Sequence, residues 1–277
     1  MLPGSLLPHI AFRIIYRLDD KKHMPMTPTA SDIKAKIPAP PKKAISWKHS
    51  PLVVGTVSTA EGLKYLSNCP KGVDLVEIRL DILLARGVSP DLIQETMATR
   101  TTPTLLTLRT REEGGAFNWR SRQRVLFFLK FIPFADAVDL ELTNIPRLSR
   151  VLRNVRRMKR DLIISSHSLK RKLTPLRLRR LLQQFRQTRA QVYKIVGLAR
   201  RRKDLHVLAE PLLRQSHMRL AIMASGPLAT ASRISLPALG SRLVYVFLDE
   251  PTAPGQPGHT YGFTLTDLRS CTSPKGM

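Results

Sequence analysis

Eight short apolar runs recur along the chain at similar spacing, and amphipathic segments separate them. The runs cover residues 52–58, 75–81, 104–109, 137–142, 162–167, 192–198, 220–224 and 243–248. Short aliphatic or β-branched runs that alternate with helical patterns are typical of a parallel sheet built from βα units. Two helix starts fit this pattern, because Ser89 precedes Pro90 and Thr174 precedes Pro175, which places an N-cap side chain before a first-turn proline.

Eight such repeats predict a closed sheet. About 225 residues are available for them, close to the about 250 residues of a typical (β/α)8 barrel. An open doubly wound sheet is the alternative, but no Gly-x-Gly-x-x-Gly or phosphate loop follows the first run, which weakens its nucleotide-binding version. We therefore predict an α/β fold: a parallel, eight-stranded (β/α)8 TIM barrel over residues 51–277.

The two ends of the chain depart from the repeat. Residues 1–50 are rich in Pro and Lys and carry almost no periodic apolar pattern, so we expect a basic N-terminal extension, disordered or extended, without a core of its own. The stretch after Gln256 leaves room for only a short final helix. No run is long and apolar enough to span a bilayer, so we expect no membrane partner.

The 277 residues include 46 Lys and Arg against 20 Asp and Glu, a net charge of +26. This excess concentrates in residues 147–203 and raises the possibility of a nucleic-acid partner. The basic residues there alternate with apolar ones at helical spacing, however, and base-stacking aromatic residues are lacking. Solvated outer helix faces explain the pattern, and we expect no nucleic-acid partner.

Two cysteines, Cys69 and Cys271, lie far apart in the sequence. They cannot supply a disulfide framework or a four-ligand zinc site. We therefore expect a reducing, cytoplasmic location.

Polar residues gather where the predicted strands end, which is where (β/α)8 barrels carry their chemistry. They include Glu77, Arg79, Asp81, Arg109, Glu113, Asp139, Glu141, Ser165, Ser166, His167, Lys194, Ser232 and Arg233, followed by residues 249–256. In the second run, alternation directs Glu77, Arg79 and Asp81 to the same side.

Lys194 stands inside an otherwise apolar strand. Burial and neighbouring cations would both lower its pKa, which makes the neutral amine available as a nucleophile toward a carbonyl. The alternatives are that Lys194 extends to the barrel rim or pairs with Glu141.

His167 ends the strand before the one that carries Lys194. A single histidine at a strand end is often only structural. If the strand order is right, however, one group could hold a carbonyl as an imine while the other moves a proton beside it. Glu113 could orient the imidazole.

These residues together resemble the type I 3-dehydroquinate dehydratase (3-dehydroquinase) family over about residues 52–256. The resemblance rests on the order of several short pieces along successive strands: 77–81, 107–115, 139–142, 165–167 with Thr174 and Pro175, 193–195, 232–233 and 253–256. Each piece alone is common, whereas their order and spacing are specific.

The resemblance implies a carbon–oxygen lyase of the shikimate pathway that converts 3-dehydroquinate to 3-dehydroshikimate and water without a metal or organic cofactor, as a homodimer. Lys194 matches the imine-forming lysine, His167 the general acid and base, and Glu113 the carboxylate that orients it. Arg233 matches the residue that binds the substrate carboxylate. The remaining substrate-binding or supporting positions are matched by Glu77, Arg79, Arg109, Thr252 and Gln256.

The sequence departs from the family pattern at two site positions. Thr252 stands where the family usually has Ser, and Ser168 stands where Asp often follows the histidine. Two other functions are weighed against the dehydratase: a different imine-forming lyase or aldolase on the same barrel, and a basic nucleic-acid-binding protein that retains a decayed barrel.

Overall fold

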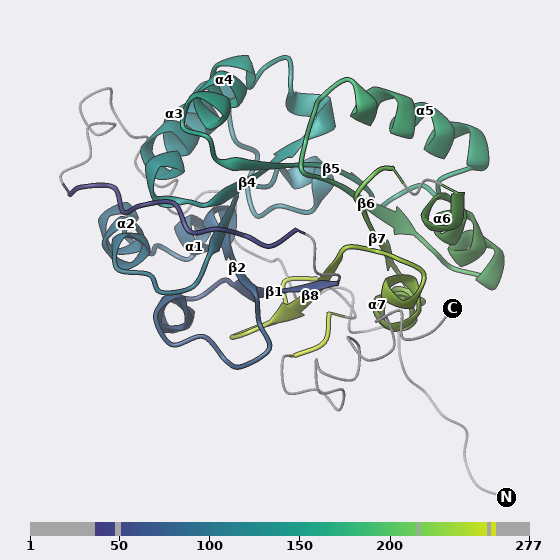
Figure 1. The fold of residues 1–277 in the computed structure, drawn as a ribbon, viewed down its shortest axis with the longest axis horizontal. Coiled ribbons are helices and arrows are strands. Elements are labelled where there is room, and N and C mark those ends of the chain that lie inside the picture. Colours follow the sequence, from purple (N-terminus) through teal and green to yellow (C-terminus); the bar gives the residue numbers. More distant parts are fainter. Residues whose placement is uncertain (1–36, 48–50, 215–216, 254–255, 259–277) are drawn as a thin grey trace, which may run out of the picture.

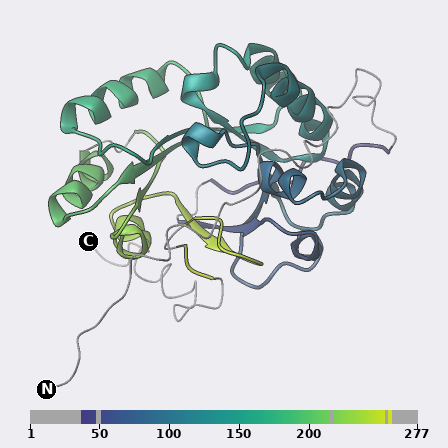
Figure 2. The ribbon, with the colours of Figure 1, turned by 180° about the vertical axis from the view of Figure 1, so that it is seen from behind.

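The computed structural model describes residues 37–47, 51–214, 217–253 and 256–258. Eight parallel strands form the centre of this part of the chain, and helices surround them in a ring (Figures 1 and 2). The strands are β1 (Leu52–Val57), β2 (Leu75–Arg79), β3 (Thr104–Thr107), β4 (Ala137–Glu141), β5 (Asp161–Ser168), β6 (Val192–Leu198), β7 (Leu220–Ser225) and β8 (Leu243–Phe247). Each strand falls on one of the eight predicted runs, so the predicted barrel is confirmed.

The helices that connect the strands are α1 (Leu80–Ala85), α2 (Pro90–Ala98), α3 (Ser121–Phe131), α4 (Ser149–Arg157), α5 (Pro175–Arg186), α6 (Arg202–Arg214) and α7 (Ala229–Ala238). Short 3-10 turns occupy Glu61–Leu66, Arg111–Glu113, Ile132–Phe134 and Leu142–Asn144. The two predicted caps form: the Ser89 hydroxyl accepts a hydrogen bond from Asp91 N, and the Thr174 hydroxyl accepts one from Arg177 N. The predicted final helix lies outside the described residues.

The barrel is nearly closed. β1 pairs in parallel with both β2 and β8, and neighbouring strands continue the pairing around to β7. Among the described residues, β7 and β8 form no ladder, but Arg242 N, immediately before β8, donates a hydrogen bond to Leu220 O of β7 at 2.8 Å. The Ser241 hydroxyl accepts from Ile222 N and donates to Ile222 O at this seam, so a side chain satisfies backbone groups that a ladder would otherwise pair.

Two apolar layers hold the fold. The larger lies between the strands and the helices and contains the buried rings of Phe127, Phe131 and Phe185. The smaller layer consists of inward-facing strand residues, including Leu105 and Ile163, and fills the barrel at the N-terminal ends of the strands, which we call the lower barrel. Because the lower barrel is packed with side chains, chemistry is confined to its other end.

Residues 37–47 lie at the N-terminal ends of the strands, and Figure 1 shows them, in purple, running from near α2 toward the centre of the ring. Trp47 Nε1 and Lys42 Nζ both contact Asp161, at 2.8 and 2.7 Å, and Lys43 N donates to Asp136 at 2.6 Å. Ile45 and Trp47 pack against the lower barrel layer. This part of the predicted extension is therefore attached to the barrel, while residues 1–36 and 48–50 lie outside the described residues.

Asp136 allows a test of how much the contacts at the N-terminal end of the barrel stabilise the fold. Its side chain is fully buried and forms an ion pair with the buried Arg100. Replacing Asp136 by alanine should lower the free energy of unfolding by about 3–5 kcal/mol, since the Arg100 charge would stay buried without a partner. Urea denaturation would measure the change. The exposed Glu95→Ala variant is the control, with an expected change within about 0.5 kcal/mol. Equal stabilities of the two variants would contradict this account.

No helix among the described residues has the length and apolar character needed to cross a bilayer.

Candidate active site

A cavity of about 550 Å³ opens at the C-terminal ends of the strands. All nine residues predicted for the site line it: Glu77, Arg79, Arg109, Glu113, His167, Lys194, Arg233, Thr252 and Gln256. They come from β2, β5, β6, α7 and the two segments that follow β3 and β8, so residues far apart in the sequence meet at one end of the barrel. Apolar side chains, among them Leu169, Val196 and Met223, form the rest of the wall.

Lys194 points into the barrel from β6 and is 4% exposed. Its Nζ lies 3.5 Å from Asp139 Oδ2, 3.9 Å from Glu77 Oε1 and 3.8 Å from the ring centroid of Tyr245. Burial lowers the pKa of Lys194, and Arg109 also lowers it, while the two carboxylates partly oppose this shift. The lysine therefore neither extends to the rim nor pairs with Glu141, and its amine is held inside the cavity.

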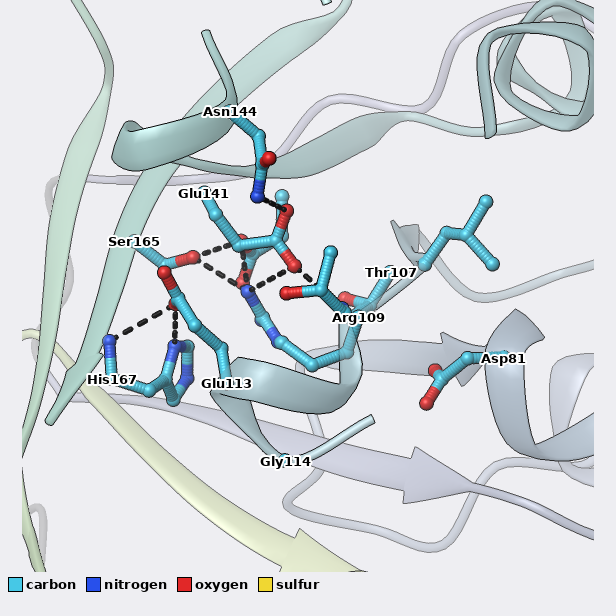
Figure 3. Close-up of polar contacts among 12 residues, drawn as sticks. Asp81, Thr107, Arg109, Glu113, Gly114, Glu141, Asn144, Ser165 and His167 are labelled. Carbon is cyan, nitrogen blue, oxygen red and sulfur yellow. Dashed lines mark hydrogen bonds and ion pairs between the residues drawn. The ribbon is translucent and has the colours of Figure 1, made fainter. Parts of the chain in front are cut away.

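His167 and Glu113 form a dyad, drawn in Figure 3, in which the Glu113 carboxylate faces both the ring and the backbone N–H of His167. Glu113 Oε2 lies 2.8 Å from His167 Nδ1 and accepts from His167 N at 3.0 Å. The Thr143 hydroxyl donates to the other carboxylate oxygen at 3.1 Å. With Nδ1 engaged, Nε2 is the ring nitrogen left for a molecule in the cavity.

Burial shifts both members of this dyad toward their neutral forms. It raises the pKa of Glu113 to about 7, with Arg109 opposing the shift. It lowers the pKa of His167 well below its ordinary value, and the positive charges of Arg109 and Lys194 add to this effect. The imidazole of the unliganded site is therefore neutral near pH 7.

Two arginines of the site are already paired with carboxylates. Arg79 binds Asp81 through Nε at 3.0 Å and Nη2 at 2.8 Å. Arg109 binds Asp139 through Nη2 at 2.7 Å and also donates to the Ser165 hydroxyl at 2.7 Å. Because their guanidinium groups are engaged, these arginines support the site and set its potential.

Arg233, on α7, is different. It is 7% exposed, no carboxylate of the described residues pairs with it, and its Nε is buried without a hydrogen-bond partner. Its Nη1 donates to Ala229 O at 2.9 Å. Burial lowers the pKa of Arg233 to about 10, so the group remains a cation at neutral pH. A buried guanidinium without a counter-ion is suited to binding an anion.

Thr252 and Gln256 join the site through a chain of hydrogen bonds. Gln256 Oε1 accepts from both N and Oγ1 of Thr252 at 2.9 Å, and its Nε2 donates to Thr56 Oγ1 at 3.1 Å. Thr56 donates in turn to Glu77 Oε2 at 3.1 Å. The hydroxyl of Thr252, which stands where the family usually has a serine, therefore takes part in the hydrogen-bond network of the site.

Sequence reasoning left Asp139 and Tyr245 out of the predicted site. Asp139 is fully buried and binds both Arg109 and Lys194. Asp139 faces inward on a strand and belongs to one of the short pieces that resemble the family, and these two features could have identified it from the sequence. Tyr245 forms part of the cavity wall under Lys194, and its buried hydroxyl has no hydrogen-bond partner among the described residues. In the sequence, the only indication of this role is that Tyr245 is a polar aromatic residue within the predicted eighth strand.

The described residues contain no cluster of three or more His, Cys, Asp or Glu side chains arranged to hold a metal ion.

The fold and this cavity define a (β/α)8-barrel protein with a buried lysine, an imidazole–carboxylate dyad and an unpaired guanidinium at the strand ends. The sequence profile described as Type I 3-dehydroquinase matches residues 52–260. The chain belongs to the type I 3-dehydroquinase family.

Relatives and solved structures agree with this assignment. The chain is 29% identical over 206 residues to a 3-dehydroquinate dehydratase of Methanocella arvoryzae, covering 74% of this chain and 91% of the relative. It is 25% identical over 209 residues to one of Methanococcoides burtonii, covering 74% and 89%. The type I enzyme of Clostridium difficile with covalently modified comenic acid superposes with a TM-score of 0.68 at 18% identity, covering 80% of this chain and 92% of that one. At 18% identity, the similarity to the Clostridium difficile structure shows that the two chains share a fold.

Proposed function

We propose that this protein is a carbon–oxygen lyase that dehydrates 3-dehydroquinate to 3-dehydroshikimate through an imine on Lys194. Family membership supports the reaction, and one observation carries the mechanism: Lys194, the His167–Glu113 dyad and the unpaired Arg233 line the same cavity. The conjugated enone product absorbs ultraviolet light where the substrate does not, so a rise in absorbance tests the activity directly. Activity on a related hydroxyketone but none on 3-dehydroquinate would instead favour another imine-forming lyase.

The proposed reaction begins at Lys194, whose lowered pKa favours the neutral amine. Its neutral amine attacks the substrate ketone, and the resulting carbinolamine takes up one proton from solvent and loses one water to give an iminium. The iminium withdraws electrons from the adjacent carbon and acidifies its C–H bond. Asp139 and Glu77, the two carboxylates near Nζ, stabilise this cation as they stabilise the ammonium.

His167 then removes the proton from the adjacent carbon through Nε2, and an enamine forms. As the enamine collapses to the conjugated iminium, the hydroxyl leaves and takes a proton from the imidazolium. Water then hydrolyses the conjugated iminium, which releases the product, regenerates the neutral Lys194 amine and returns one proton to solvent. One water is lost overall, because the water released in forming the imine is consumed in its hydrolysis.

The carboxylate of the substrate would bind Arg233, whose guanidinium lacks a counter-ion. Replacing Arg233 by alanine should lower kcat/KM by about 30- to 1,000-fold, mainly through KM, since a buried charge-assisted contact of about 2–4 kcal/mol is lost. Arg233→Lys should recover part of the loss. Steady-state kinetics would measure both, with the exposed Arg219→Ala variant as control. An unchanged KM in the alanine variant would exclude this role.

The Glu113 carboxyl should control the acid side of the pH profile. Its pKa is raised to about 7 by burial, so the active carboxylate is present above pH 7 and is lost as the pH falls through that value. Protonated Glu113 would donate to Nδ1 and leave the hydrogen on Nε2, the tautomer that cannot accept the substrate proton. We expect kcat/KM to fall as the pH drops below about 7.

A Glu113→Gln variant provides the comparison for this pH effect. Its amide should mimic the protonated acid, so kcat/KM should be about 10- to 100-fold lower and should show no step near pH 7. Measuring kcat/KM from pH 5 to 9 in both proteins would test this, because kcat/KM reports the groups of the free enzyme, in which burial raises the pKa of Glu113. Survival of the same acid limb in the glutamine variant would assign it to another group.

Three further features remain proposals: a catalytic barrel over residues 51–277 with an extension over residues 1–50, a homodimer, and a cytoplasmic place in the shikimate pathway. Light scattering of the purified chain would test the dimer.

A further inference from the structure

Seven basic side chains follow the two strands that carry His167 and Lys194. They are Lys170, Arg171 and Lys172 in the loop after β5, Arg200 and Arg201 in the loop after β6, and Arg202 and Lys203 in the first turn of α6. All seven are exposed. We call this set the cationic rim.

The cationic rim lies at the mouth of the cavity by topology. Loops that follow the strands of a parallel barrel emerge at the strands' C-terminal ends, which is the end that holds the cavity. Leu169, next to the first rim residue, lines the cavity wall. The two loops belong to neighbouring units, because β5 pairs with β6, and α5 and α6 follow each other around the ring in both ribbon views (Figures 1 and 2).

Almost none of this charge is neutralised locally. Among the described residues only Lys172 has a carboxylate partner, Asp204, at 3.4 Å. Asp204 also accepts hydrogen bonds from the backbone N–H groups of Arg200 and Arg201, at 3.1 and 3.0 Å. This aspartate therefore ties the two loops together while leaving six cations without a paired anion.

We propose that the cationic rim attracts the anionic substrate to the mouth of the cavity and so raises kcat/KM. The proposal rests on the proposed function, in which the substrate carries a carboxylate. Like charges around a cleft raise the local concentration of an oppositely charged ligand and its association rate. Arg233 then binds the carboxylate inside, so the rim acts on approach and not on chemistry.

The competing explanation is that net charge alone, and not its placement, produces the attraction. The chain offers a matched control: Arg150, Arg153 and Arg157 on α4 are exposed, have no carboxylate partner among the described residues, and line a separate hollow of about 680 Å³ beside α3. Reversing three charges there changes the net charge as much as reversing three rim charges.

The experiment compares the wild-type protein with two triple variants, Lys170→Glu/Arg171→Glu/Arg201→Glu and Arg150→Glu/Arg153→Glu/Arg157→Glu. Raising the salt concentration from about 10 to about 150 mM, which shortens the screening length from about 30 to about 8 Å, should lower wild-type kcat/KM by about 3- to 10-fold. At low salt the rim variant should lose about 10-fold in kcat/KM with kcat unchanged within about twofold, and its salt dependence should flatten. The α4 variant should stay close to wild type. Equal losses in the two variants, or an unchanged rim variant, would overturn the proposal.

A second measurement does not depend on turnover. Titration of the His167 ring by nuclear magnetic resonance reports the potential at the site, because nearby positive charges lower the pKa of an imidazole. The rim variant should raise the pKa of His167 more than the α4 variant does, and equal shifts would refute the rim. If the wild-type protein formed no enone but this difference appeared, the proposed function would fail, whereas the positive potential that the rim places at the cavity would be established separately.

Discussion

Replacing Lys194 by alanine will reduce dehydration of 3-dehydroquinate by more than about 10⁴-fold, because loss of the group that forms the covalent intermediate leaves only binding and the surrounding charges. Measurement of enone absorbance over long incubations would set the limit. Among the described residues that line the cavity, Lys194 carries the one amine that can convert the ketone to an iminium, so we expect no neighbouring side chain to substitute for it.

A charge-preserving variant separates the nucleophilic role of Lys194 from an electrostatic one. Lys194 lies between Asp139 and Glu77, and its removal leaves those carboxylates without the cation. Lys194→Arg keeps the positive charge but cannot form the imine, so it should be as inactive as the alanine variant. The exposed Lys71→Ala variant should retain wild-type activity. Substantial turnover by Lys194→Arg would mean that the lysine contributes only its charge.

Replacing His167 by alanine should lower kcat by about 10²- to 10⁴-fold, which is the range for loss of a general acid–base group. The defect should lie in elimination. Borohydride should still trap a substrate adduct on Lys194 in this variant, although more slowly, because imine formation needs the amine more than the imidazole. Stopped-flow absorbance and mass spectrometry would measure the two steps separately.

The exposed His206→Ala variant serves as the control for this experiment and should behave as wild type. Rapid product formation by His167→Ala would show that another group moves the proton. Absence of both adduct and product would place His167 in imine formation itself and would require a different order of proton transfers.

The barrel could be predicted from the sequence because its signals are local. Each apolar run is long enough for one strand, and capping residues such as Ser89 and Thr174 lie next to the helices they begin. The meeting of His167 and Lys194 also followed from strand order, since parallel neighbours bring their carboxyl ends to the same edge.

Long-range contacts were beyond sequence reasoning. The pattern predicted closure but not the seam between β7 and β8, where a hydroxyl of Ser241 takes the place of ladder bonds. It likewise gave no sign that Trp47 and Lys42 would bind Asp161. Such contacts depend on which side chains meet across the fold, and no local periodicity encodes that.

Within the site, the sequence likewise did not determine which carboxylate would lie near Lys194. Alternation places both Asp139 and Glu141 on the inner side of β4, and the sequence could not say which would reach the amine. In the folded protein Glu141 accepts hydrogen bonds from Thr110 N and Arg124, which leaves Asp139 near Lys194.

Reduction with borohydride in the presence of 3-dehydroquinate tests the central claim most directly. Peptide mass spectrometry of the inactivated protein should find one substrate-derived adduct, and it should lie on Lys194. Full turnover with an unmodified Lys194, or an adduct confined to another lysine, would contradict the account.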